Sequence, residues 1–235
     1  HPIKHDLKKF DEVRAEILRL VEILDTGQEK NDVRRKNVLK QGINFIDHTL
    51  KTNYYRNNKT ALSFRLDPRY LDEIPMNRAS KFPELPYGIF YIRGMRFFGF
   101  HIRFKDLARG GLRTVFPEQV EQAEAERDNV FTECYNLAYT QQKKNKDIPE
   151  GGSKAIIFLS PHDRLKSEAA ILEKELKKAD IAAERVEETM STFRREQKVE
   201  YLHHSQRAFV ESLVTILNCD ADGTLRAKHI IDYWK

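Results

Sequence analysis

The spacing of apolar residues changes twice along this chain of 235 residues, and this constrains the fold more than any other feature. From Ile3 to Leu24, apolar side chains recur every three or four residues, which is typical of an amphipathic helix. From Ala61 the period falls to two, as in strands, and after Ser160 the helical spacing returns without a further glycine until Gly223. The chain is therefore expected to be an α/β protein with helices at both ends.

Residue patterns give the boundaries of the expected elements. The first helix should end near Thr26 and Gly27, and a second helix over about 30–50 should pair with it as an antiparallel hairpin. We expect its inward-facing residues to be apolar: Val38, Leu39, Ile43, Ile46 and Leu50. Strands are predicted at 61–66, 87–93, 98–104 and 155–159, a loop at 75–86, a long helix from Pro117, and two or three helices over 160–218.

These elements predict a mixed sheet flanked by helices, with added helical hairpins at the N-terminus and after residue 160. The expected division is an N-terminal helical hairpin at 1–56, an α/β core at 57–160, a helical insertion at 161–218, and the start of a further segment at 219–235.

Composition narrows the class of protein. Charged residues make up 33% and hydrophobic residues 40%, and no apolar run approaches the length of a membrane span. With no signal-peptide pattern, we expect a cytoplasmic protein whose Cys134 and Cys219 are reduced thiols. The histidines show no metal spacing, so no metal site is expected. The net charge of +5 permits nucleic-acid binding, but acidic residues interleave with the basic ones, as on an ordinary solvated surface.

Two glycine pairs associated with strands carry clusters of cations. Gly110-Gly111 is flanked by Arg109 and Arg113, and Gly151-Gly152 lies between a lysine-rich stretch and Lys154. We expect each pair to form a tight turn whose backbone N–H groups can approach an anion closely. The second pair follows a helix and opens a strand, the reverse of a phosphate-binding loop, and the sequence contains no G-x-G-x-x-G. A small molecule carrying carboxylates is the expected ligand.

Four phrases carry a resemblance to a known family. They are TALSFRLDP (60–68), YGIFYIRG (87–94), GFHIRFKDLARGGLR (99–113) and TQQKKNKDIPEGGSK (140–154). Together they resemble the substrate domain of the amino-acid dehydrogenases of the glutamate/leucine/phenylalanine/valine type. The nearest subgroup is the large NAD-dependent glutamate dehydrogenases. The similarity covers about 44–154 and resumes near 220–234. It implies the fold of that family's N-terminal domain.

The resemblance also implies roles for individual residues. Lys154 is similar to the catalytic lysine of the family's GGxK motif, which assists oxidative deamination. Lys143 or Lys144 would bind the substrate α-carboxylate, and the spacing leaves both open. Arg109 stands where compact glutamate enzymes carry a lysine for the distal carboxylate, and a guanidinium fork suits the same group. The glycines at 110, 111, 151 and 152 would let the substrate approach the backbone. For Arg113, an alternative is bracing of the turn by pairing with a nearby carboxylate.

The implied parent reaction converts L-glutamate, NAD and water to 2-oxoglutarate, ammonium and NADH. We expect a homo-oligomer in which NAD and the catalytic aspartate belong to regions absent from this chain, so that the chain alone is inactive. Two alternatives remain open. The first is a non-catalytic helical module for assembly, and the second is a basic nucleic-acid binder, whose affinity would fall steeply with salt.

Overall fold

A computed structural model describes residues 6–74, 77–117, 120–144, 147–160 and 163–217. The predicted segment 219–235 and Lys146 lie outside these ranges. The helices are α1 (Leu7–Glu22), α2 (Glu29–Asp47), the 3-10 helix η1 (Pro68–Asp72), α3 (Arg78–Lys81), α4 (Val120–Lys143), α5 (Asp163–Lys178) and α6 (Ala183–Leu217). The strands are β1 (Thr49–Thr52), β2 (Leu62–Leu66), β3 (Gly88–Arg93), β4 (Phe97–Arg103), β5 (Ala108–Arg109), β6 (Leu112–Val115) and β7 (Gly151–Leu159).

The strands form one mixed sheet. Its order is β1-β2-β3-β4-β7, and β5 and β6 both pair with the free side of β7. Neighbours from β1 to β7 are antiparallel, whereas β5 and β6 run parallel to β7. The predicted α/β class with a mixed sheet flanked by helices is thus confirmed. β5 and β6 are two pieces of a single edge, interrupted at Gly110 and Gly111.

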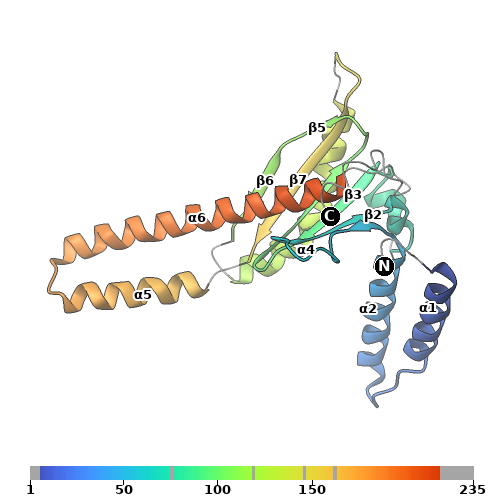
Figure 1. The fold of residues 1–235 in the computed structure, drawn as a ribbon, viewed down its shortest axis with the longest axis horizontal. Coiled ribbons are helices and arrows are strands. Elements are labelled where there is room, and N and C mark those ends of the chain that lie inside the picture. Colours follow the sequence, from blue (N-terminus) through green and yellow to red (C-terminus); the bar gives the residue numbers. More distant parts are fainter. Residues whose placement is uncertain (1–5, 75–76, 118–119, 145–146, 161–162, 218–235) are drawn as a thin grey trace.

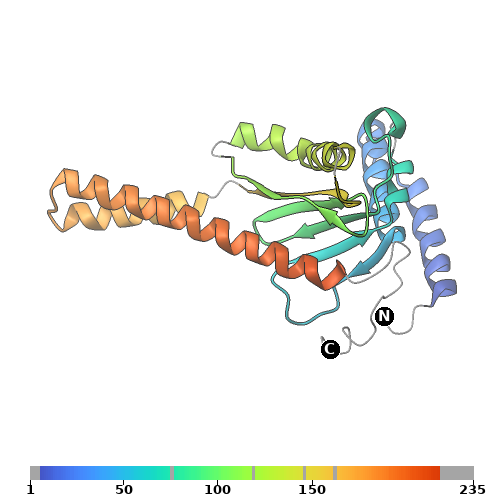
Figure 2. The ribbon, with the colours of Figure 1, turned by 90° about the horizontal axis from the view of Figure 1, so that it is seen from above.

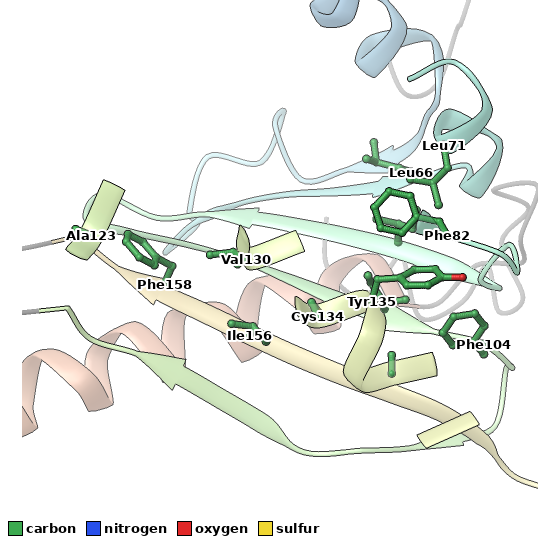
Figure 3. Packing of buried hydrophobic residues seen from close by; sticks show 13 residues of the cluster. Leu66, Leu71, Phe82, Phe104, Ala123, Val130, Cys134, Tyr135, Ile156 and Phe158 are labelled. Atoms are coloured by element: carbon green, nitrogen blue, oxygen red, sulfur yellow. The ribbon is translucent and has the colours of Figure 1, made fainter. Parts of the chain in front are cut away.

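Side-chain alternation assigns the two faces of the sheet. In β4, Phe98, Phe100 and Ile102 belong to the cluster on the α4 face, whereas Phe97 belongs to the cluster on the α6 face, where Phe209 also lies close to Gly99. The α4 face holds the larger hydrophobic cluster, in which Tyr135 of α4 meets Phe104 at the end of β4 (Figure 3). Helices from distant parts of the sequence therefore pack on both faces of the sheet.

Helix α6 has two roles along its length. Its C-terminal half packs on the sheet (Figure 2). There, Phe209, Leu213 and Ile216 belong to the same hydrophobic cluster as Phe90 and Ile157. Its N-terminal half leaves the sheet and pairs with α5 in a projecting arm (Figure 1). The region predicted as a helical insertion therefore also supplies one layer of the core.

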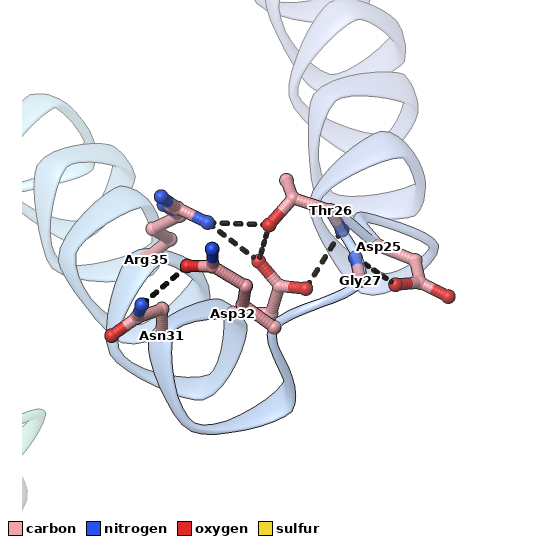
Figure 4. A network of polar contacts seen from close by, with 7 residues as sticks. Asp25, Thr26, Gly27, Asn31, Asp32 and Arg35 are labelled. Carbon is pink, nitrogen blue, oxygen red and sulfur yellow. Dashed lines mark hydrogen bonds and ion pairs between the residues drawn. The ribbon is translucent and has the colours of Figure 1, made fainter.

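The N-terminal hairpin is confirmed, and a polar network closes its turn. The buried carboxylate of Asp32 accepts hydrogen bonds from the Thr26 amide at 2.7 Å and the Thr26 hydroxyl at 2.6 Å, and Arg35 pairs with the same carboxylate at 3.0 Å (Figure 4). These hydrogen bonds, those from Thr26 above all, lower the pKa of Asp32 to about 2. Asp32 therefore holds the α1–α2 turn as a carboxylate at neutral pH.

The predicted inward face of α2 is wrong for three of its five residues, since only Ile43 and Leu50 are partly buried. Val38, Leu39 and Ile46 are 66%, 47% and 58% exposed. The helix contacts its neighbours through other positions, among them Phe45, whose ring lies 5.2 Å from that of Phe64 on β2. Apolar spacing identified the helix, but the arrangement of α1 and the sheet decided which of its faces is covered.

The strand predictions at 61–66, 87–93 and 98–104 match β2, β3 and β4. The strand predicted at 155–159 starts earlier, at Gly151. The predicted loop at 75–86 contains the short α3, and β1, β5 and β6 were not predicted. No helix within the described ranges is long and apolar enough to cross a membrane.

Candidate functional site

The two glycine pairs lie side by side at the edge of the sheet. In the parallel register, Ala108 is opposite Gly151 and Arg109 is opposite Gly152, and pairing resumes with Leu112 opposite Ala155. The segment Gly110-Gly111 therefore runs beside Ser153 and Lys154. Pairing of β5 and β6 with β7 thus brings together two motifs that are about 40 residues apart in the sequence.

Neither pair forms the tight turn that the sequence predicted. Gly151 and Gly152 are the first residues of β7, and of the glycines within the described ranges only Gly27 has a positive φ, 74°. Close contact is the reason for glycine at this edge. A methyl group at Gly110 would lie 1.6 Å from the carbonyl oxygen of Ser153, and one at Gly152 would lie 2.3 Å from that of Ala138 on α4.

The two neighbouring glycines allow a matched test of this explanation. We expect Gly110→Ala to cost at least about 3 kcal/mol, because the backbone of Ser153 must move to admit the methyl group. For a chain of this size, this corresponds to a fall of roughly 6–12 °C in melting temperature. Gly111→Ala should change the melting temperature little, since the nearest atom to its methyl group would be Lys154 Nζ at 3.8 Å. Equal losses in the two variants would refute the close-contact explanation.

Lys154 lies on β7 next to this edge, and its side chain is partly buried. Its Nζ is the closest group to the position of a Gly111 methyl, so its ammonium lies at the glycine segment. Helix α4 holds the backbone here, because Cys134 Sγ donates to the Lys154 carbonyl at 3.3 Å. Burial raises the pKa of the Cys134 thiol to about 12, which keeps it protonated and able to donate. Cys219 lies outside the described ranges.

Arg109 and Arg113 each pair with a glutamate that the sequence motifs did not single out. Arg109 Nε lies 2.8 Å from Glu150 Oε1; the Arg109 side chain is 69% exposed and that of Glu150 only 8%. Glu150 directly precedes Gly151, and this adjacency is the sequence signal that could have identified it. Arg113, on β6, pairs with Glu133 of α4; it thus has the carboxylate partner that the bracing alternative expected, but it joins a strand to a helix and does not brace a turn.

The C-terminal end of α4 approaches the second glycine pair. Gln142 Oε1 accepts a hydrogen bond from the Gly152 amide at 2.7 Å, although nothing in the sequence distinguished Gln142 from Gln141. Lys143 Nζ lies 2.7 Å from Glu84 Oε2, and this hydrogen bond raises the pKa of Lys143. Lys143 is therefore a cation at neutral pH. Lys144, just beyond α4, is exposed.

A buried imidazole lies on the strand next to Lys154. His101 is opposite Ala155 in the pairing of β4 with β7 and is 8% exposed. Burial, and to a smaller extent the nearby Arg103, lower the pKa of His101 to about 3. His101 is thus neutral and adds no charge to the edge. Within the described residues, no group of three or more His, Cys, Asp or Glu side chains is placed to hold a metal ion.

Comparison with known proteins places this chain in a family. The model of the bacterial NAD-glutamate dehydrogenase catalytic domain matches residues 22–183, more than half of the chain. Glutamate dehydrogenase 2 of Dictyostelium discoideum is 40% identical over 167 residues, which cover 71% of this chain and 15% of that protein. The NAD-specific glutamate dehydrogenase of Saccharomyces cerevisiae is 50% identical over 117 residues, and that of Neurospora crassa is 48% identical over the same length.

These matches cover 10% to 15% of the relatives' own lengths, so the chain corresponds to a small part of each. The matched region includes both glycine pairs, Arg109, Lys154 and all of α4. The chain belongs to the family of bacterial NAD-glutamate dehydrogenase catalytic domains.

Proposed function

We propose that this chain is the glutamate-binding part of a catalytic domain that oxidatively deaminates L-glutamate to 2-oxoglutarate and ammonium with NAD. The observation that carries the proposal is the position of Lys154 Nζ at the Gly110-Gly111 segment, next to Arg109 on the same sheet edge. Two cationic side chains beside exposed backbone suit a substrate with two carboxylates.

In this proposal, each cation has a separate task. Lys154 holds and transfers a proton at Nζ beside the reacting carbon, as a general acid–base lysine does. Arg109 binds the distal carboxylate. Its guanidinium has five N–H donors, and Glu150 is paired with Nε, so the exposed remainder of the fork can meet a second carboxylate. Lys143 or Lys144 binds the α-carboxylate.

We propose that NAD, which accepts the hydride in this reaction, is bound by a domain outside this chain. The residues described here do not fit a dinucleotide site, because the sheet is mixed and largely antiparallel, and the sequence contains no G-x-G-x-x-G. We further propose a cytoplasmic homo-oligomer that binds L-glutamate and 2-oxoglutarate.

The division between binding and catalysis gives a direct test. The 235-residue chain alone should produce no NADH from glutamate and NAD. It should nevertheless be stabilised by glutamate or 2-oxoglutarate, since a ligand that binds only the folded state raises the melting temperature. The matched control is Arg109→Met, in which the stabilisation by either ligand should be lost. Robust NADH production would refute the division, and a melting temperature insensitive to both ligands would refute the substrate role.

A helical assembly function is the second candidate, and one observation favours it. On α1, Val13, Ile17 and Leu20 follow a four–three spacing and are 50%, 43% and 49% exposed. Such a stripe is typical of a helix that packs against a partner helix. Association that depends on protein concentration and is unaffected by glutamate would support this function in place of substrate binding.

A further inference from the structure

A hollow opens on the α4 face of the sheet. It does not include the glycine edge, that is, the sheet edge where Gly110-Gly111 and Gly151-Gly152 lie side by side. Helix α4 packs over β7 and β4, and α2 and η1 pack near β2. A helix is about 10 Å wide and covers roughly two strands at their spacing of about 4.8 Å. The floor between these helices, formed mainly by β3 and β4, is therefore left open. The hollow has a volume of about 550 Å³.

Aromatic side chains are half of the described residues that line the hollow. Six partly exposed rings line it: Phe45, Tyr70, Tyr91, Phe98, Phe100 and Phe131. Their ring contacts fix them in place, with centroids 5.1 Å apart for Tyr91 and Phe100 and 5.1 Å for Phe100 and Phe131. Burial raises the pKa of both tyrosines, so their hydroxyls are protonated and can donate hydrogen bonds. The surface is rigid, apolar and already formed.

Two cations lie along the same hollow. Arg93 ends β3, with its guanidinium carbon 5.9 Å from the centre of the Phe98 ring. Arg127 precedes Phe131 by one turn on α4. Arg127 forms an ion pair with Asp128 at 3.6 Å. Both side chains are exposed, so this pair contributes little stabilisation. The described lining residues include no acidic side chain. The hollow therefore combines an apolar wall with a positively charged rim.

We propose that this hollow binds a small anion with a planar apolar body, such as an aromatic carboxylate. Its volume lies in the range of small-molecule sites, about 300–1,000 Å³, and such sites combine apolar walls with a few polar groups. The rings would stack on the body of the ligand, and the guanidiniums would pair with its anionic group.

The site is distinct from the glycine edge. The described lining of the hollow includes neither the glycines nor Arg109 or Lys154, although the two sites are close: Phe100 in the hollow is opposite Ile156, which is two residues of β7, roughly 7 Å, from Lys154. Helix α4 connects them, because it supplies Phe131 to the hollow and Gln142 to the Gly152 amide. A ligand in the hollow would thus contact the helix that supports the glycine edge.

Two fluorescent probes test the proposal on the whole chain. Anilinonaphthalene sulfonate is a planar apolar anion, and N-phenylnaphthylamine is its counterpart without the sulfonate. We expect the sulfonate to bind at one saturable site and to shift the methyl NMR signals of Ile74 and Ile89. The double variant Arg93→Gln, Arg127→Gln should lower the affinity for the sulfonate by about tenfold or more, because the charge-assisted contacts are lost. Its affinity for the neutral probe should not change.

Arg195→Gln, on the projecting arm, is the matched control and should leave both affinities unchanged. The proposal is overturned if the sulfonate shifts only the methyl signals of Ile17 and Leu20 on α1, or if its binding does not saturate. It is also overturned if the double variant weakens both probes equally. Self-association of the chain that excludes the sulfonate would instead assign the hollow to a second copy. None of these results depends on glutamate turnover, so they leave the proposed function untouched.

Discussion

Replacing Lys154 with alanine in a full-length enzyme that carries this sequence is expected to lower kcat by about 10²–10⁴-fold, the range for loss of a positioned proton-transfer group. The expectation rests on the position of Nζ at the Gly110-Gly111 segment, on a strand whose backbone α4 holds through Cys134. Steady-state turnover of glutamate and the melting temperature, measured on the same preparation, give the result. The melting temperature should change little, because the Lys154 side chain is only partly buried.

Two further variants separate the possible causes of this loss. Lys154→Arg keeps the positive charge but does not release a proton near neutral pH, so it should remain as inactive as the alanine variant if proton transfer is the role. Lys178→Ala removes an exposed lysine of α5 whose ion pair with Glu175 is on the surface, and it should have normal turnover. Near-normal turnover of Lys154→Ala would exclude Lys154 from the chemistry. Recovery of activity in Lys154→Arg would reduce its role to electrostatics.

Arg109→Met should lower kcat/KM for glutamate by about 30- to 1,000-fold and leave any trace activity on norvaline level or raised. The proposed function requires this exposed edge to be covered when the complete enzyme binds its substrate, so the variant would leave the distal carboxylate unpaired and desolvated. Such a loss costs roughly 2–4 kcal/mol. At 1.36 kcal/mol per factor of ten, this cost gives the expected fold-change. Norvaline has no such carboxylate, so it should not pay this cost. Initial rates on both amino acids, together with a melting curve, measure the effect.

The contact between Arg109 and Glu150 suggests a competing explanation, in which Arg109 stabilises the sheet edge and does not bind substrate. If Arg109 only braces the edge, its loss should reduce activity on both substrates equally and lower the melting temperature. With 69% of the Arg109 side chain exposed, however, the ion pair itself should contribute little stability. Glu150→Gln gives a second test of the role of this ion pair. It should tighten glutamate binding if Glu150 competes with the substrate for the guanidinium, and weaken it if the pair organises the edge.

The sequence alone determined the parts of this protein that follow from local periodicity. Helical spacing identified α1, α2, α4 and the arm, and alternation identified β2, β3 and β4, because each pattern marks which side of an element can be buried. The motifs around Arg109 and Lys154 also identified the candidate site residues, since those residues are contiguous with the glycine pairs. The roles proposed for them remain predictions.

Tertiary structure alone decided the rest. β5 and β6 are too short to have a period, and they exist as strands because β7 pairs with them. The same pairing replaces the predicted tight turns with extended glycines, whose missing side chains admit a neighbouring backbone. Lys143 and Arg113 pair with Glu84 and Glu133, which are distant from them in the sequence. The packing of separate elements also decides that an apolar face of α2 is left uncovered. A periodic pattern predicts which residues can be buried. The contacts between elements determine which of these residues are buried and which partner each charged side chain has.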